Sequence, residues 1–170
     1  CNVTFALKEL RATGEFYFDT TCDGVITNGL RLCTGSRFRC YKVTKLPDMP
    51  IVVEPDAVVG LRADSVCAYT SPVTVGRGAT VEADCVQNMS FASGLDLAGT
   101  LNQVNSASLL IESTLSGNGT LAGAHVRFSG TNSCWRLVAD DTGFTNKVDV
   151  SGVTDPALLT GLAAIEIVYT

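Results

Sequence analysis

The sequence predicts an all-β protein, and within that class a parallel β-solenoid with capping termini. One short apolar pattern occurs three times, beginning at Leu30, Ile51 and Val73, so its spacing is 21 and then 22 residues. Apolar and polar residues alternate through much of the remaining chain, and glycines and prolines separate the short apolar runs. With 46% hydrophobic and 17% charged residues, the 170-residue chain can bury a core and does not have the composition of a disordered protein.

Each copy of the pattern has two apolar residues two positions apart, a small or turn residue, and then another apolar residue. A fixed period of this length is typical of repeat architectures, in which no unit can bury its apolar face alone. The copies are residues 30–38, 51–59 and 73–81.

Stacking of the copies in register would place equivalent apolar residues side by side on inward faces. One such triplet comes from the start of the pattern and the other from its end. The expected triplets are Leu30, Ile51 and Val73, and Phe38, Val59 and Val81.

The chain is expected to form a single β domain over residues 1–170, with three parts. Residues 1–24 form a cap or strand, although residues 7–12 could instead make one helical turn. Residues 25–128 form the repeat coils, and Leu95 keeps the period because it begins a similar run 22 residues after Val73. Residues 129–170 form C-terminal strands, together with a short helix over 155–162 that starts at an Asp-Pro pair.

The three copies resemble the coils of right-handed parallel β-helix proteins on bacterial surfaces. In those coils a pattern of the kind apolar-x-apolar-x-x-Gly-x-x-apolar recurs once per turn. The resemblance implies one coil for each copy and identifies no single family. The alternative fold is a β-sandwich or jelly roll, in which short strands and turns recur every 8–12 residues or so.

The cysteines favour a disulfide framework in an oxidising compartment, and hence a secreted protein that is extracellular or at a cell surface. None forms a CxxC pair and the chain has one histidine, so zinc spacing is lacking. The odd count leaves one thiol over, the connectivity stays open, and the first cysteine could carry a bridge or a lipid. The seven candidates are Cys1, Cys22, Cys33, Cys40, Cys67, Cys85 and Cys134.

Three N-glycosylation sequons fit a glycoprotein, at Asn2, Asn88 and Asn118. The net charge of −5 comes without a basic cluster, which argues against nucleic-acid partners. No apolar run approaches the ~20 residues of a transmembrane segment.

No residue pattern predicts a catalytic, metal or cofactor site. His125 lies in an alternating strand and is expected to face solvent without a nucleophile or carboxylate beside it. The acidic residues around Asp140, Asp141 and Asp149 match no calcium loop and indicate a solvated turn. Four other aspartates recur near the coils but at different positions of the repeat, so a single acidic row is not expected. These are Asp56, Asp64, Asp84 and Asp96.

The function predicted first is structural: a subunit of an extracellular fibre, surface layer or adhesin that self-associates as a homopolymer or binds cell-surface partners. The candidate assembly strand carries Ile165, Ile167 and Tyr169 on one face, with Glu166 as its one charge. This strand could instead close its own sheet. The alternative function is a glycan-binding module, and a glycan-active enzyme comes third. Candidate residues for stacking on sugars are Trp135, Tyr69 and Phe91, although each could equally be buried packing.

Overall fold

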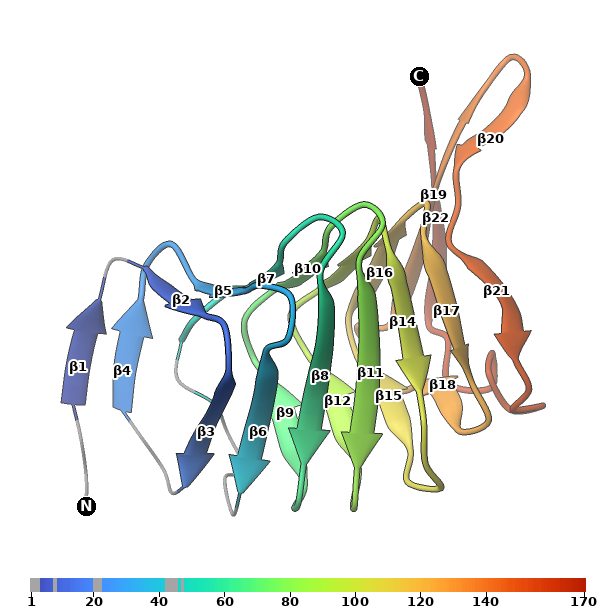
Figure 1. The fold of residues 1–170 in the computed structure, drawn as a ribbon. Helices are drawn as coiled ribbons and strands as arrows, with labels where there is room; N and C mark the ends of the chain where they lie inside the picture. Colours follow the sequence, from blue (N-terminus) through green and yellow to red (C-terminus); the bar gives the residue numbers. More distant parts are fainter. Residues whose placement is uncertain (1–3, 8, 20–22, 42–45, 47) are drawn as a thin grey trace.

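The computed structural model describes residues 4–7, 9–19, 23–41, 46 and 48–170, and none of these residues is helical. The described strands pair in parallel, with the β19–β20 hairpin as the one antiparallel pair among them. Figure 1 shows successive turns of the chain stacked along one axis, with β1 at one end and β22 at the other. The protein is therefore a parallel β-solenoid, and the antiparallel sandwich is excluded.

Successive turns contribute strands to three main sheets that enclose the core, and the third sheet has strands from four of these turns only among the described residues. Sheet 1 is the nine-stranded sheet, sheet 2 the seven-stranded one and sheet 3 the four-stranded one; β1 and β4 form a further pair. Sheet 1 contains β2 (Leu10–Ala12), β5 (Leu30–Leu32), β7 (Ile51–Val53), β10 (Val73–Val75), β13 (Leu95–Leu97), β16 (Thr114–Gly117), β19 (Cys134–Asp140), β20 (Gly143–Asn146) and β22 (Ala164–Tyr169). Sheet 2 contains β3 (Glu15–Asp19), β6 (Arg37–Tyr41), β8 (Val58–Ala63), β11 (Thr80–Cys85), β14 (Thr100–Gln103), β17 (Thr120–Gly123) and β21 (Asp149–Val153). Sheet 3 contains β9 (Cys67–Tyr69), β12 (Met89–Phe91), β15 (Leu109–Ile111) and β18 (Val126–Phe128), and the further pair is β1 (Thr4–Leu7) with β4 (Asp23–Ile26).

The register of sheet 1 confirms the first predicted triplet. Leu30 is paired with Ile51, Ile51 with Val73, and Val73 with Leu95. All four side chains are buried, because inward positions of one turn lie directly over those of the next. The 21–22-residue period is thus one turn of the solenoid.

The second predicted triplet is only partly right. Val59 is paired with Val81, but Phe38 is paired with Leu61, because β6 and β8 are offset by two residues relative to the sequence pattern. Ser36 takes the inward place before Phe38 and is buried. Its hydroxyl oxygen lies 2.6 Å from the carbonyl oxygens of both Ala12 and Cys33, so a polar group is satisfied where the pattern predicts an apolar one.

The small residue of the repeat marks a left-handed corner between sheets 1 and 2. Gly35, Asp56 and Gly78 have φ of 84°, 58° and 72° in three successive turns. Glycine enters this conformation without strain, and aspartate is among the few other residues that tolerate it. The corner fixes where the chain leaves sheet 1 and enters sheet 2.

Backbones approach closely where glycines stack near the same corner in later turns. A Cβ atom on Gly99 would lie 2.4 Å from the carbonyl oxygen of Gly76, and one on Gly119 would lie 2.0 Å from the carbonyl oxygen of Gly99. Both distances are below any real Cβ contact, so these positions have no room for a side chain.

Two local expectations are corrected by the structure. Residues 10–12, placed in a possible helical turn, form strand β2. Residues 155–162 form turns instead of a helix. There the carboxylate of Asp155 accepts a hydrogen bond from the Ala157 N–H at 2.8 Å, as in an Asx-turn. The N–H groups of Leu158, Thr160 and Leu162 each donate to the carbonyl oxygen three residues earlier, so the segment forms consecutive turns.

The predicted disulfide framework finds no support in the described part of the chain. Cys33, Cys67, Cys85 and Cys134 are free thiols. Cys1 and Cys22 lie outside the described residues, as does the side chain of Cys40. Burial of Cys67 and Cys85 as apolar groups accounts for their inward places in β9 and at the end of β11. Among the described residues there is no helix long and apolar enough to cross a membrane.

We predict that Gly119→Ala is destabilising while Gly14→Ala is nearly neutral. The new Cβ at position 119 meets the carbonyl oxygen of Gly99, which belongs to the stacked backbone, whereas a Cβ on Gly14 meets nothing within 4 Å. Overpacking of this kind lowers the free energy of unfolding by about 1–3 kcal/mol or more. Urea unfolding followed by circular dichroism measures both variants, and equal midpoints would contradict the close stacking of turns.

Candidate functional site

Strand β22 lies at the end of the solenoid and keeps one edge open. It is paired in parallel with β19 along its whole length, from Ala164 opposite Cys134 to Tyr169 opposite Ala139. No described strand is paired with its other edge. In Figure 1, β19, β20 and the C-terminal strand rise together beyond the body of the solenoid. We call these three strands the terminal blade.

One face of β22 is apolar and exposed to solvent. Ile165, Ile167 and Tyr169 are 56%, 59% and 66% exposed. They share the face of β19 that carries Leu137, which is buried. The candidate assembly strand therefore lies on the surface with its isoleucines exposed. It also extends the chain's own sheet 1 through its pairing with β19, as the alternative expected.

Polar contacts attach β22 to the rest of the terminal blade. Glu166 accepts a hydrogen bond from Arg136 Nε at 2.5 Å, and this partner raises the pKa of the guanidinium. The hydroxyl of Tyr169 donates to the carboxylate of Asp141, which raises the pKa of the phenol. Exposed pairs of this kind contribute little stability, so the position of the strand depends mainly on its backbone pairing with β19.

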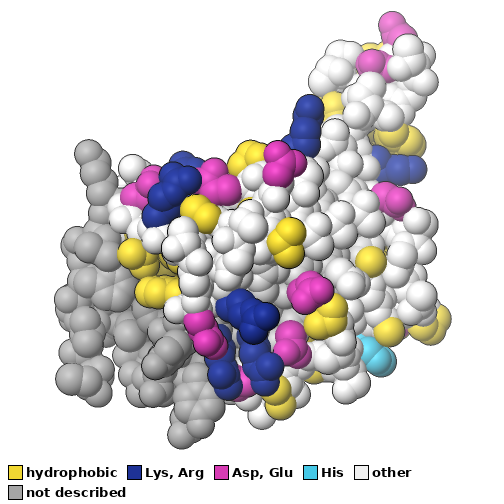
Figure 2. All heavy atoms as spheres, in the orientation of Figure 1, with side chains coloured by type: hydrophobic (Ala, Val, Ile, Leu, Met, Phe, Trp, Pro, Cys, Tyr) yellow, Lys and Arg dark blue, Asp and Glu magenta, His cyan; other side chains and the backbone are white. Residues whose placement is uncertain are grey.

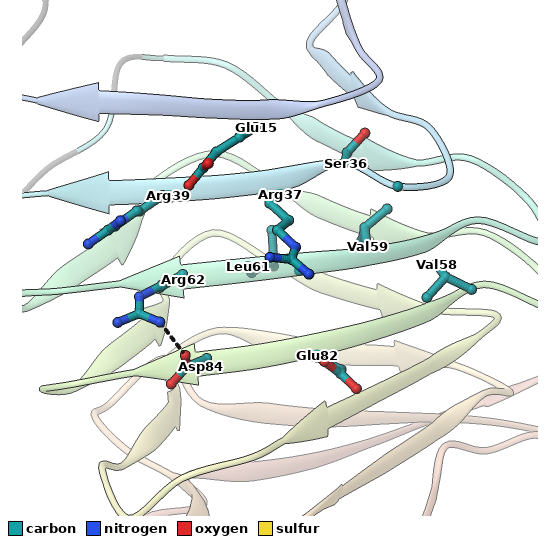
Figure 3. A pocket seen from close by; sticks show the side chains of 12 residues that line it. Glu15, Ser36, Arg37, Arg39, Val58, Val59, Leu61, Arg62, Glu82 and Asp84 are labelled. Carbon is teal, nitrogen blue, oxygen red and sulfur yellow. Dashed lines mark hydrogen bonds and ion pairs between the residues drawn. The ribbon is translucent and has the colours of Figure 1, made fainter.

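A second candidate site is a groove on the outer face of sheet 2, which we call the charged groove. It has a volume of about 510 Å³ and runs across β3, β6, β8 and β11 (Figure 3). Figure 2 shows basic and acidic side chains intermixed in this region, while much of the surrounding face is uncharged. The charged residues that line it are Glu15, Arg37, Arg39, Arg62, Glu82 and Asp84.

The floor of the charged groove is open because Gly60 presents no side chain. Gly60 stands between Arg37 on β6 and Glu82 on β11 in the ladder of sheet 2. Arg37 extends from β6 over β8, as Figure 3 shows. Among the described residues Arg37 has no ion-pair partner within 4 Å, so its guanidinium is available to a ligand.

The other arginines of the groove are held by carboxylates from successive turns. Asp64 accepts hydrogen bonds from Arg39 and, at 3.1 Å, from Arg62, which also donates to Asp84 at 3.0 Å. Arg39 is the main cause that lowers the pKa of Asp64, and Arg62 adds to it. A carboxylate held ionised in this way is poorly suited to donate a proton.

The four aspartates near the coils divide into two groups. Asp64 and Asp84 come together through Arg62. Asp56 takes the left-handed corner, and Asp96 lies on sheet 1, where it accepts a hydrogen bond from Ser116 at 3.4 Å. As expected from their different places in the repeat, they form no single row.

The aromatic residues proposed to stack on sugars do not form an exposed platform. Tyr69 and Phe91 are buried and stack on each other with ring centroids 5.2 Å apart. Trp135 is half-buried and packs against Phe128. For Tyr69 and Phe91 the alternative of buried packing is correct, because inward positions of sheet 3 require large apolar side chains to fill the core.

The remaining sequence candidates lie outside the charged groove, although Asp140 is the last residue of β19 in the terminal blade. His125 is half-buried, and its backbone N–H donates to Gln103 at 3.2 Å. Asp140 accepts hydrogen bonds from the N–H and hydroxyl of Thr142 within a turn, and no cluster suited to a metal ion occurs in the described residues. Asn88 and Asn118 are exposed, whereas Asn2 lies outside the described residues.

Sequence reasoning missed Arg37, Gly60 and Arg62 as groove residues. The available signal was alternation: Arg37 and Arg39 are two residues apart around a buried phenylalanine, so both face outward. The offset between β6 and β8 hid their alignment with Gly60 and Arg62.

No protein-family model, curated protein or solved structure matches this chain.

We predict that Asp64→Asn lowers stability at neutral pH and that the difference from the unsubstituted chain shrinks in acid. The folded-state pKa of Asp64 lies below its unfolded value, so its stabilising contribution is present above that unfolded value. It is lost as the pH falls through the lower folded-state pKa. Urea midpoints measured at pH 7 and at about pH 3 test this. A difference that stays constant across this range would contradict the assignment.

Proposed function

We propose that the protein is a secreted structural subunit of an extracellular fibre, surface layer or adhesin, which assembles through exposed β-strand edges. The observation that carries the proposal is the open, apolar edge strand β22. An exposed edge offers unpaired N–H and C=O groups to another chain, and proteins that remain monomeric usually block such edges.

Strand β22 lacks the usual blocking devices. It contains no proline and no lysine, and its single charge, Glu166, is already paired with Arg136. At the opposite end of the solenoid, β2 and β3 also have an edge with no partner among the described strands. Both ends of the stack can thus accept further strands.

The surface composition supports an extracellular, assembled protein. Only 17% of the residues are charged, which suits a chain whose surface is covered in an assembly. The sequons at Asn88 and Asn118 lie in exposed turns, where a glycan could be attached. The low charged fraction and the two exposed sequons thus support the proposed extracellular location.

Ile167→Lys should weaken self-assembly and leave the fold intact. The side chain is exposed, so its replacement opens no cavity, whereas a lysine would enter the contact of an assembled edge. Loss of about 1.5 kcal/mol of apolar contact corresponds to roughly tenfold weaker association. Light scattering and electron microscopy over a concentration series measure the effect.

The matched control is Val86→Lys, at an equally exposed valine in the turn that follows β11. It should assemble like the unsubstituted chain. A chain that stays monomeric at high concentration before any substitution would contradict the proposal.

A second candidate function is glycan binding in the charged groove. The groove offers Arg37, which has no ion-pair partner among the described residues, together with carboxylates, and such groups form charge-assisted hydrogen bonds with hydroxyl or carboxylate groups of a sugar chain. Its length across β3, β6, β8 and β11 suits an extended ligand better than a compact one.

If the groove binds a glycan, Arg37→Ala should lower the affinity by about 10- to 100-fold, the equivalent of one charge-assisted hydrogen bond. A glycan array finds the ligand, and titration calorimetry measures the variant. Arg77→Ala is the control, because Arg77 is exposed but does not line the groove. Equal losses in both variants would mean that only general charge matters.

A further inference from the structure

We infer that two copies of this chain associate through antiparallel pairing of their β22 strands across a two-fold axis, with Ile167 opposite Ile167. The inference rests on the proposed function, since it names the partner and the register of the same edge. It follows from the hydrogen bonds between β22 and β19, the faces of β22 and its length.

The existing ladder determines which backbone groups of β22 face outward. The N–H of Ala164 donates to Ser133 at 3.2 Å, and that of Thr170 donates to Ala139 at 3.0 Å, both on the β19 side. Backbone groups in a strand alternate in direction from one residue to the next. The N–H and C=O groups of Ile165, Ile167 and Tyr169 therefore point to the open edge.

This alternation selects the register of an antiparallel partner. Residues that exchange both hydrogen bonds must all have open-edge groups. Placing Ile167 opposite its own copy also places Ile165 opposite Tyr169 twice, which gives about six N–H···O=C bonds across the interface. Sliding the strands by two residues removes at least one of these three pairs, and sliding by one mismatches both the bonds and the faces.

The side chains fit the same register. Ile165, Ile167 and Tyr169 share one face, so two copies form a continuous apolar row with β-branched and aromatic residues opposite each other. Glu166 falls opposite Val168 and not opposite the other Glu166. The interface thus contains no directly opposed like charges.

The rival arrangement is head-to-tail pairing of β22 with β2 of another copy. It would bring Glu166 near Arg11, which is a favourable charge pair. However, β2 spans three residues and β22 spans six, so half of the open edge would stay unpaired. The two-fold arrangement pairs the whole strand, and two-fold interfaces are the commonest kind in homo-oligomers.

Cysteine cross-linking tests the register directly. In Ile167→Cys the two introduced thiols would face each other at a Cα separation of about 5.5 Å, which a disulfide can bridge. Mild oxidation should give a dimer whose 167–167 link is found by peptide mass mapping. The unsubstituted chain and Val86→Cys, treated identically, control for links through the chain's own cysteines.

Two further variants in the same strand sharpen the test. Ile165→Cys alone should give no 165–165 link, because position 165 faces Tyr169. A mixture of Ile165→Cys and Tyr169→Cys should give a 165–169 link. All three positions are exposed, and circular dichroism verifies that each variant is folded.

The outcomes separate this inference from the proposed function. A 167–167 link with a 165–169 link in the mixture supports the two-fold register. Links from position 167 to residues 10–12 would overturn it in favour of head-to-tail pairing, and polymers without any link at 167 would overturn it while leaving assembly intact. A chain that is monomeric at every concentration would overturn both.

Discussion

The fold depends on the close parallel stacking of one turn of backbone on the next. Neighbouring strands in a sheet lie about 4.8 Å apart, so every inward position must accept the side chain or backbone of the turns on either side. The stacked glycines at 76, 99 and 119 show this limit most directly, because no Cβ fits between them. The apolar period, the left-handed corners and the buried ladders all follow from this spacing.

The same stacking makes the outer faces. Residues about one turn apart become neighbours, so Arg39 meets Asp64 and Arg62 meets Asp84 although each pair is separated by more than 20 positions in the sequence. A missing side chain in one turn, as at Gly60, becomes a gap in a continuous surface. The charged groove therefore depends on the register between neighbouring strands of sheet 2. If one strand were shifted relative to the next, Gly60 would no longer lie between Arg37 and Glu82.

Much of the fold could be predicted from the sequence because the period is a local signal. The triplet of Leu30, Ile51 and Val73 needed only the spacing of apolar residues. The second triplet failed at Phe38, because a buried serine with satisfied hydrogen bonds does not look like a core residue. The charged groove could not be predicted because it depends on the same offset between β6 and β8. The free thiols could not be predicted because disulfide formation depends on the distances between cysteines in the fold, which their spacing along the chain does not determine.

The two open ends of the solenoid determine which assemblies the chain can form. A two-fold contact through β22 closes when two copies have joined, so it cannot by itself produce a fibre. Longer growth needs a second contact, and β2 and β3 have unpartnered edges at the opposite end of the described stack. If that second contact also joins like ends, the fibre alternates the two kinds of junction and has no polarity. If it joins unlike ends, β22 is used in both, and the two contacts compete for a single edge.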